Sequence, residues 1–362
     1  MPFFQPTIPE LPETLNLANQ VAVVTGATAG IGQELSLQLL RLGISHLIIG
    51  ARNLQKGFQA RLRLLSDSCV QEKNPRCQIT VLELDLARFD SVKAFASEVI
   101  KASPRLDMLV LCAGINLAHF EETEDGNELC MQVNVLSNSL LSFIFLPILR
   151  STTQQYYVPS ASSQRATMTW VGSMGQALHS PSLGLAIDAE TAILPYFSSP
   201  RYYSAIRRYP DTKLFVSLIV RELAQRLSPL KKEDGTGEES PVIVNCVCPG
   251  TVRTGADNNL PFWLRIPMNA NRALRGRSVQ EGARAVMWAL RGRLHGEDNN
   301  PSGHYIANNT VQHLPPFADT VEGQSFGKRL FDEVLSLGRQ VDDRIALSWR
   351  GLVTSDQDGS EN

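Results

Sequence analysis

A glycine-rich turn between an apolar strand and a helix is the feature that most constrains the fold of this chain. The sequence Thr25-Gly26-Ala27-Thr28-Ala29-Gly30-Ile31-Gly32 follows an apolar run at 21–24 and precedes a helical pattern at 34–40. Glycines in such a turn let the backbone bend sharply, approach a pyrophosphate closely and present free N–H groups of the helix to negative charge. The segment predicts a dinucleotide site, although glycines at this spacing also occur in plain tight turns.

Strands and helices alternate through the following 200 or so residues. Further strands are predicted at 46–50, 79–86, 108–114, 155–160 and 242–247, and helices at 54–68, 91–101, 127–149 and 211–227. Apolar runs separated by helices indicate a parallel, doubly wound sheet with helices on both faces. We therefore expect a single Rossmann-like α/β domain over 1–362, with a core over 15–310 and a C-terminal extension over 311–362.

Two segments interrupt this alternation. The charged stretch 231–240 is typical of a solvated surface loop. The stretch 164–208 is long for a connection, and long connections in compact domains tend to be functional or disordered. We expect 164–208 to be an insertion that covers a substrate, together with 254–278. Both segments carry aromatic side chains: Trp170, Tyr196, Phe197, Tyr202, Tyr203, Phe262 and Trp263.

The overall charge argues against large polyanionic partners. Lys+Arg 34 against Asp+Glu 36 gives a net charge of -2, so no global attraction to nucleic acid or an anionic membrane is expected, and a small molecule is the expected partner.

The apolar stretch 140–149 is about half the length of a bilayer span and predicts a buried helix. The start of the chain lacks the pattern of a signal peptide, and its six cysteines show no metal-ligand spacing. We expect a cytoplasmic protein without a metal site.

A tyrosine and a lysine stand four positions apart in Tyr209-Pro210-Asp211-Thr212-Lys213. On a helix the two side chains would share one face, about one turn apart. A nearby positive charge favours the phenolate form of a tyrosine, which can then exchange a proton with an alcohol or a carbonyl. The same pair would also suit a solvated helix face, and Pro210 fits only in the first turn of a helix.

Two further polar residues are candidates by position. Ser160 ends the predicted strand 155–160, and side chains at the carboxyl ends of parallel strands face the crevice where doubly wound sheets bind ligands. Serine clusters also simply form turns. Asn134 lies within the predicted helix 127–149, where an asparagine is more often an exposed or capped polar group.

Taken in order, these residues resemble the short-chain dehydrogenase/reductase superfamily. The ordered matches are the glycine motif Thr25 to Gly32, Cys112-Ala113-Gly114 where the family has Asn-Asn-Ala-Gly, Asn134, Ser160, Tyr209-x-x-x-Lys213 and Asn245-x-x-x-Pro249-Gly250. They cover roughly residues 15 to 310, and an ordered set is far more specific than any one of its elements. The long connection before Tyr209, Arg221-Glu222-Leu223-Ala224 and the stretch 51–57 are similar to fungal-type members that act in specialised metabolism.

The resemblance implies a role for each matching residue. Tyr209 would be the general acid/base, Lys213 would promote its ionisation and hold the nicotinamide ribose, and Asn134 would support a proton-relay water. Ser160 would orient the substrate oxygen, or Ser162 or Ser163 if the strand ends later. The cofactor-binding residues implied are Gly26, Thr28, Gly30, Ile31, Gly32, Arg52, Asn53, Asp85, Leu86, Ala113, Gly114, Asn134, Tyr209, Lys213, Pro249, Gly250, Val252 and Thr254.

The residue at the end of the second strand indicates which cofactor is preferred. An acidic side chain there would bind the ribose 2′-hydroxyl and repel a 2′-phosphate, whereas this chain has Arg52. Because arginine suits a phosphate dianion, we expect NADP(H) rather than NAD(H).

The sequence thus predicts an NADP(H)-dependent oxidoreductase that interconverts a carbonyl and an alcohol on a small hydrophobic substrate. Two alternatives remain: a nucleotide-binding sensor or scaffold that has lost catalysis, and a non-redox dehydratase or epimerase. The family and the apolar helices at 136–149 and 214–223 favour a homodimer or homotetramer. A monomer that covers those faces with its own chain is the other possibility.

Overall fold

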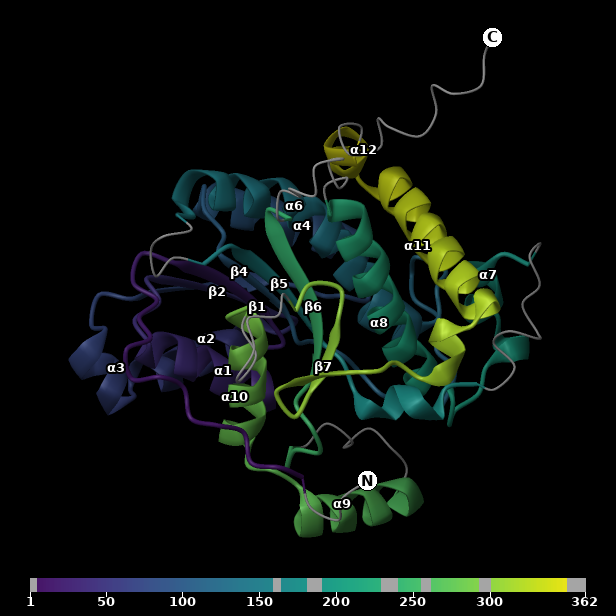
Figure 1. Ribbon diagram of the computed structural model, residues 1–362, viewed down its shortest axis with the longest axis horizontal. Coiled ribbons are helices and arrows are strands. Elements are labelled where there is room, and N and C mark those ends of the chain that lie inside the picture. The colour runs from purple at the N-terminus through teal and green to yellow at the C-terminus, as the bar shows by residue number, and fades with distance from the viewer. Residues whose placement is uncertain are drawn as a thin grey trace, which may run out of the picture.

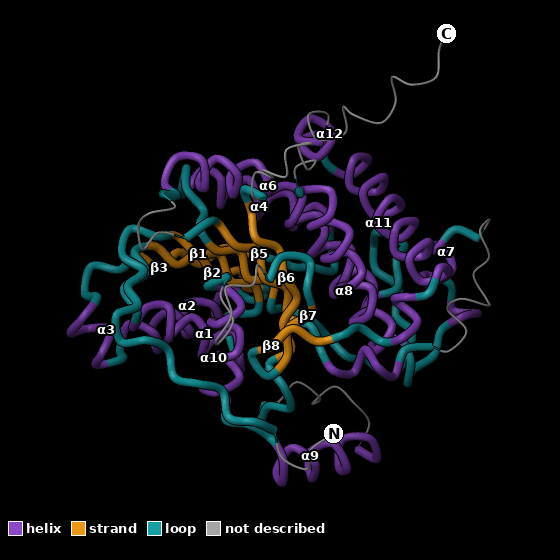
Figure 2. The backbone as a smooth tube through the Cα atoms, viewed as in Figure 1, coloured by secondary structure: helices purple, strands orange, loops and turns teal. Residues whose placement is uncertain are grey.

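The computed structural model describes residues 5–158, 164–180, 191–228, 240–254, 262–292 and 301–349. In these residues, eight strands form one central sheet with helices on both faces (Figure 1, Figure 2). The strand order is β3-β2-β1-β4-β5-β6-β7-β8, and all neighbours are parallel except β7 and β8. The strands are β1 (Val21–Thr25), β2 (His46–Ala51), β3 (Gln78–Glu83), β4 (Met108–Leu111), β5 (Ala166–Val171), β6 (Val242–Cys248), β7 (Tyr305–Ala307) and β8 (Thr310–Gln312). The predicted doubly wound α/β fold is confirmed.

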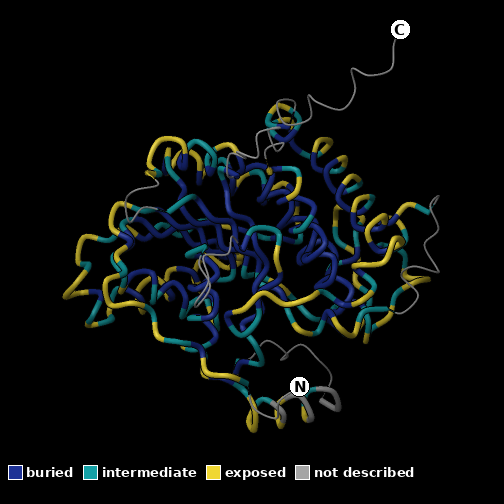
Figure 3. Tube along the Cα trace, viewed as in Figure 1, coloured by how far each residue is buried: buried dark blue, intermediate teal, exposed yellow. Residues whose placement is uncertain are grey.

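Two layers of helices bury the two faces of the sheet, so that the strands lie at the centre of the core (Figure 3). One layer contains α1 (Gly30–Arg41), α2 (Leu54–Leu65), α3 (Ser68–Lys73) and α10 (Val279–Leu290). The other contains α4 (Phe89–Ala102), α6 (Ser137–Tyr156) and α8 (Arg208–Leu227). A further helix, α9 (Phe262–Arg275), projects from the body (Figure 1), and Gln5 donates to the carbonyl of its last residue, Arg275, at 2.8 Å.

The strand order reverses beside β1, which pairs with β2 on one side and β4 on the other. The connections from β1 and from β4 leave toward opposite faces of the sheet, which opens a crevice above the carboxyl ends of these strands. All residues of β1, β2 and β4 are buried, as their continuously apolar sequences predict. The fold therefore places the glycine turn after β1 at the mouth of this crevice.

The prediction of a strand at 155–160 is wrong. Gln155 and Tyr156 form the last turn of α6, and the strand that pairs with β4 and β6 is Ala166–Val171. Local β propensity is a weak guide here, because the buried position between two strands selects the segment that fits. Ser160, Ser162 and Ser163 lie outside the described residues. Trp170, expected in a substrate cover, is a β5 residue with 1% exposure.

The helix predicted at 127–149 is a continuous run from Leu129 to Tyr156 with a change of pitch inside it. It begins as α5 (Leu129–Met131), widens into the π-helical turn η1 (Gln132–Leu136) and continues as α6. In the described part of the chain it is the one helix long and apolar enough to cross a membrane, yet 94% of its most apolar window is buried in the protein. The buried helix expected around 140–149 is thus confirmed as part of the core.

The C-terminal extension packs against the outer side of α6 and α8 (Figure 1). It forms α11 (Val321–Val341) and α12 (Asp343–Trp349), joined to β8 by the 3-10 turn η4 (Pro316–Asp319). The rings of Phe143, Phe331 and Trp349 make edge-to-face contacts at centroid distances of 5.5 to 5.8 Å. The apolar side chains of α6 and α8 that were expected to pair between subunits are therefore buried within one chain.

We expect Phe331→Ala to lower the free energy of unfolding by about 3–5 kcal/mol, because it removes a fully buried ring from the contact between α11 and α6. Equilibrium unfolding in denaturant measures the loss. Leu347→Ala on α12 is the control, since that side chain is 68% exposed and its removal should change stability by about 0.5 kcal/mol or less. Equal losses for the two variants would contradict the packing of the extension described here.

Candidate active site

The glycine turn is built so closely against the start of the loop after β4 that side chains are excluded. Gly26 has φ +70°, and a Cβ there would lie 2.9 Å from the Cα of Ala113. Gly30 has φ +55°, and a Cβ on Gly32 would overlap the carbonyl oxygen of Gly26 at 2.4 Å. These three glycines are therefore required by conformation or by contact.

The first turn of α1 is free to bind an anion. Its N-cap residue, Ala29, makes no side-chain hydrogen bond to the helix, and the first turn contains no acidic residue. Uncapped N–H groups and the helix dipole together favour a phosphate at this end. A cradle without side chains in front of such a terminus suits the pyrophosphate of a dinucleotide.

Thr25, at the end of β1, holds the opposite wall of this cradle. Its Oγ1 accepts hydrogen bonds from the N–H groups of Cys112 at 3.0 Å and Ala113 at 3.1 Å. The family has asparagine where this chain has Cys112, and the threonine hydroxyl keeps the local backbone fixed in its absence. Burial raises the pKa of the Cys112 thiol to about 11, which disfavours the reactive thiolate form. Thr25 opens the glycine motif in the sequence, yet its hydrogen-bonding role could not be predicted, because one threonine at a strand end carries no distinctive signal.

The positions expected to bind the adenosine half follow β2 and β3. Arg52 and Asn53 are exposed after β2, and the Asn53 side chain caps α2 by accepting the Lys56 N–H at 2.9 Å. Arg63, which sequence reasoning missed, donates to the carbonyl oxygen of Thr28 in the glycine turn at 3.5 Å. Arg63 thus brings one exposed cation to the turn, and Arg52 lies after the neighbouring strand β2.

Asp85 and Leu86 come directly after β3, in a turn held by side chains. The Asp85 carboxylate accepts the Ala87 N–H at 3.0 Å, and the Leu86 carbonyl accepts a hydrogen bond from the Ser137 hydroxyl at 2.6 Å. The turn therefore has a fixed shape at the edge of the crevice where an adenine would lie.

Tyr209 and Lys213 lie one turn apart at the start of α8, as predicted. The Lys213 Nζ atom is 5.6 Å from the centroid of the Tyr209 ring and donates to the carbonyl oxygen of Val171, at the end of β5, at 2.8 Å. A Cβ on Gly114 would lie 3.5 Å from the same Nζ. Pro210 falls in the first turn of the helix, where its missing N–H has no cost.

Asn134 lies in the π-helical turn η1 and connects the loop after β4 to α8. Its Oδ1 accepts the Ile115 N–H at 2.8 Å, and its Nδ2 donates to the Ile115 carbonyl at 2.9 Å and to Thr212 Oγ1 at 3.1 Å. The Thr212 hydroxyl in turn donates to the carbonyl of Tyr209 at 2.8 Å. Asn134 is 2% exposed, so the predicted alternative of a solvent-facing asparagine is wrong.

A serine that sequence reasoning missed lies beside Tyr209. Ser173 follows β5 by one residue and accepts the Gly175 N–H at 3.0 Å. A Cβ on Gly175 would be 3.2 Å from Ser173 Oγ and 3.7 Å from Cε1 of Tyr209, so the two side chains flank the same glycine. The signal that could have found it is the alternation of β-branched and aromatic residues in Ala166-Thr167-Met168-Thr169-Trp170-Val171, which marks a strand directly before the serine.

The loop after β6 runs from Pro249 to Thr254 and returns to the glycine turn. A Cβ on Gly30 would lie 3.6 Å from Cγ2 of Thr254, and Val252 is buried. The side chain of Gln5 holds this loop by accepting the Thr251 N–H at 2.8 Å and donating to the Thr251 carbonyl at 3.0 Å. Of the expected cofactor positions in this loop, Thr254 thus lies against the glycine turn, and Gln5 holds the loop in place.

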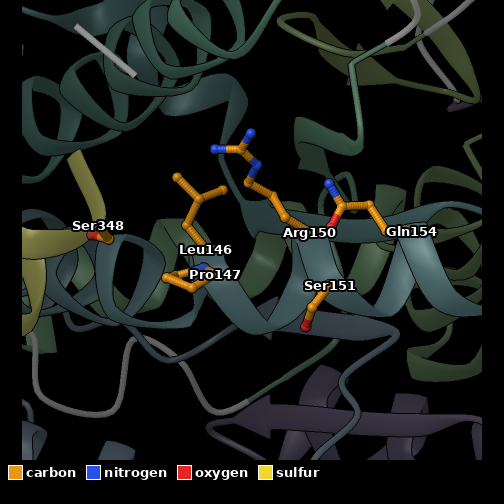
Figure 4. Close-up of a pocket in the computed structure, with 6 residues that line it drawn as sticks. All are labelled: Leu146, Pro147, Arg150, Ser151, Gln154 and Ser348. Atoms are coloured by element: carbon orange, nitrogen blue, oxygen red, sulfur yellow. The ribbon is translucent and has the colours of Figure 1, made fainter. Parts of the chain in front are cut away.

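Part of the expected substrate cover packs over the loop after β4. It contains α7 (Ile193–Ser198) and the 3-10 turn η3 (Pro200–Tyr202). Tyr203 stacks edge-to-face on Phe120 and donates to the Leu117 carbonyl at 3.2 Å. The side chains of Phe262 and Trp263 lie outside the described residues. A separate groove of about 300 Å³ between α6 and α12 contains none of the residues above (Figure 4).

Comparisons with known proteins agree with this arrangement. The family model of short chain dehydrogenases matches residues 20–173. Short chain dehydrogenase yanD of Aspergillus niger is 35% identical over 92% of this chain and 95% of its own length. Short-chain dehydrogenase/reductase tropG of Talaromyces stipitatus is 32% identical over 92% of this chain and 95% of its own.

Solved structures share the fold at lower identity. The Pseudomonas aeruginosa RhlG/NADP active-site complex has a TM-score of 0.55 at 22% identity, covering 82% of this chain and 97% of that one. An alcohol dehydrogenase from Thermococcus sibiricus, complexed with 5-hydroxy-NADP, has a TM-score of 0.50 at 19% identity, covering 80% of this chain and 95% of that one. Together with the ordered motifs and the geometry of the crevice, the fungal relatives show that the chain is an oxidoreductase that belongs to the short-chain dehydrogenase/reductase superfamily.

Proposed function

We propose that this protein is an NADP(H)-dependent oxidoreductase that interconverts a carbonyl and an alcohol on a small hydrophobic substrate. The observation that carries the proposal is the meeting of Tyr209, Lys213, Asn134 and Ser173 at the carboxyl ends of β4 and β5. That meeting point adjoins the glycine cradle through Gly114, which lies against both Asn134 and Lys213. A sensor that had lost catalysis would not need this set intact.

The residues present fit a dinucleotide. Gly26 and Gly32 permit the tight turn, since a Cβ at either position would meet protein backbone, and the uncapped N-terminus of α1 offers N–H donors to a pyrophosphate. Lys213 and Asn134 would hold the ribose end, and the loop 249–254 would close over it. When bound, the nicotinamide supplies or accepts the hydride.

The protein's own residues would handle the proton. Tyr209 gives a proton to the carbonyl oxygen during reduction and takes it back during oxidation. The ammonium of Lys213 stabilises the negative charge that develops on the phenol. The Ser173 hydroxyl, which flanks Gly175 together with Tyr209, orients the reacting oxygen by a hydrogen bond. Ser173 takes the role expected for Ser160, because it is the serine that follows the central strand.

Arg52 supports a preference for NADP(H). It is an exposed cation after β2, where an acid would select NAD(H), and Arg63 brings a second cation to the glycine turn.

The aromatic side chains of 196–203 support a hydrophobic substrate, and the likeness to fungal short chain dehydrogenases supports a place in specialised metabolism. The six free cysteines support the cytoplasmic location.

Tyr209→Phe should lower turnover of a carbonyl substrate by about 100-fold or more, because the proton donor is lost. NADPH absorbance, followed against a panel of aldehydes and ketones, measures the rate, and NADPH fluorescence checks that the cofactor still binds. Tyr156→Phe is the matched control, since Tyr156 is 45% exposed at the far end of α6. Full turnover by Tyr209→Phe would contradict the proposed acid/base role. Dehydration or epimerisation of the substrate by the wild type, without net oxidation of NADPH, would favour the non-redox alternative.

Arg52→Asp should reverse the cofactor preference, because a carboxylate repels the 2′-phosphate and binds the 2′-hydroxyl. The ratio of kcat/KM for NADPH to that for NADH measures the effect, which we expect to fall by about 100-fold. Arg76→Asp makes the same charge change on an exposed residue that precedes β3, at the amino ends of the strands and away from the crevice. An unchanged ratio in Arg52→Asp would count against the arginine as the selecting residue.

Ser173→Ala should reduce kcat by about tenfold or more, while Ser160→Ala, Ser162→Ala and Ser163→Ala leave it within about twofold. The comparison separates the serine placed beside Tyr209 from the three expected from sequence. Steady-state kinetics with a saturating carbonyl substrate measures each variant. A large loss in one of the other three variants, with Ser173→Ala unaffected, would return the role to that serine.

A further inference from the structure

A buried ion pair joins the two helices that carry the proposed catalytic residues. The Nε atom of Arg208 lies 3.3 Å from Oε2 of Glu128, and the two side chains are 1% and 0% exposed. Charges this deep are expensive unless they are paired, and removing one partner leaves the other uncompensated. Burial raises the pKa of Glu128 and the charge of Arg208 opposes that shift.

The pair connects one helix start to another. Glu128 caps α5 by accepting the N–H groups of Cys130 at 3.1 Å and Met131 at 2.9 Å. This is the start of the continuous helix in which Asn134 forms the π-helical turn. Arg208 is the first residue of α8 and directly precedes Tyr209. The contact therefore ties the start of one helix to the residue next to the phenol.

The guanidinium of Arg208 is also held by two aromatic rings. Its Cζ lies 4.8 Å from the centroid of Phe197 and 5.4 Å from that of Tyr203, both from the segment that precedes α8. Among the described residues Nε, Nη1 and Nη2 all lack a hydrogen-bond acceptor, so the contact with Glu128 is electrostatic. Asp211, one turn along α8, is engaged by the N–H and hydroxyl groups of Ser180. Glu128 is thus the anion that meets the guanidinium directly.

We propose that Arg208, paired with Glu128, is a positioning residue that sets the place of Tyr209 against Asn134. The proposal rests on the proposed function. Tyr209 is fixed from both sides: its carbonyl is bound through Thr212 to Asn134, and its N-terminal neighbour is bound to Glu128 at the start of the same helix as Asn134. Loss of the pair leaves the hydrogen-bonded link alone to hold the first turn of α8.

The test separates positioning from stability by removing one charge or both. Arg208→Met should lower kcat by about 10- to 100-fold, because a displacement of about 1 Å is enough to disturb proton transfer. The KM for NADPH should stay unchanged, because the glycine cradle is untouched. Thermal unfolding should also show a loss, from the unpaired Glu128. Glu128→Gln/Arg208→Met has no unpaired charge, so we expect its Tm to recover while kcat remains low.

Arg208→Lys keeps the charge but not the planar group, and should restore part of kcat relative to Arg208→Met. Recovery of kcat in parallel with Tm in the double variant would overturn the proposal and leave the pair a purely structural role. If Arg208→Met fails to fold, the double variant, free of an unpaired charge, decides the question alone.

Crystal structures of wild type and the double variant give a readout that does not depend on turnover. The proposal requires a displaced Tyr209 side chain in the variant, and an unmoved Tyr209 would overturn it. If the wild type reduced no carbonyl compound with NADPH, the proposed function would fail, while these structures would still decide the positioning role.

Discussion

The parallel pairing of β1 with β4 is the interaction on which the rest of the structure depends. It brings the glycine turn after β1 against the backbone of Ala113, so closely that a Cβ on Gly26 would not fit, and the Thr25 hydroxyl fastens the two segments together. Among the parallel strands that the structure describes, the strand order reverses only at this pair. The crevice therefore opens at the carboxyl ends of β1 and β4. The burial of these two neighbouring strands between two layers of helices therefore positions both the cradle and the catalytic group.

The proposed catalytic group is assembled from elements that the core fixes independently. Lys213 reaches the carbonyl at the end of β5, Asn134 reaches the loop after β4, and Thr212 joins the two helices through the Tyr209 carbonyl. The π-helical turn is consistent with this role, since one extra residue in a turn redirects a side chain and marks functional positions in many helices. In the same arrangement every polar atom of the Asn134 side chain has a hydrogen-bond partner. These hydrogen bonds offset the free-energy cost of burying an amide in a core helix.

The sequence predicts the cradle and the Tyr209 to Lys213 pair well, because both are local: their geometry is set by neighbouring residues on one turn or one helix face. It predicts Ser173 poorly, because that position depends on which of two apolar segments enters the sheet between β4 and β6, a choice made by packing against distant strands. Tyr156, Tyr157 and Val158 have strand-like side chains, yet α6 continues to Tyr156. The Arg208–Glu128 pair is invisible to sequence reasoning for the same reason, since its members come from separate helices 80 positions apart in the numbering.

Direct contacts join the C-terminal extension to the segment before α8. Glu333 of α11 accepts the N–H groups of Ile193 and Leu194 at 2.9 Å each, so it caps α7, while Phe197 of α7 packs on Phe215 of α8. The aromatic segment that leads to Tyr203 is thus fixed at one end by α11 and at the other by Arg208. Changes in its side chains can alter the surface offered to a substrate while the cradle, which belongs to a different part of the sheet, keeps its geometry. Under the proposed function, the contacts that would define the substrate and those that would define the cofactor are carried by different elements and can vary independently.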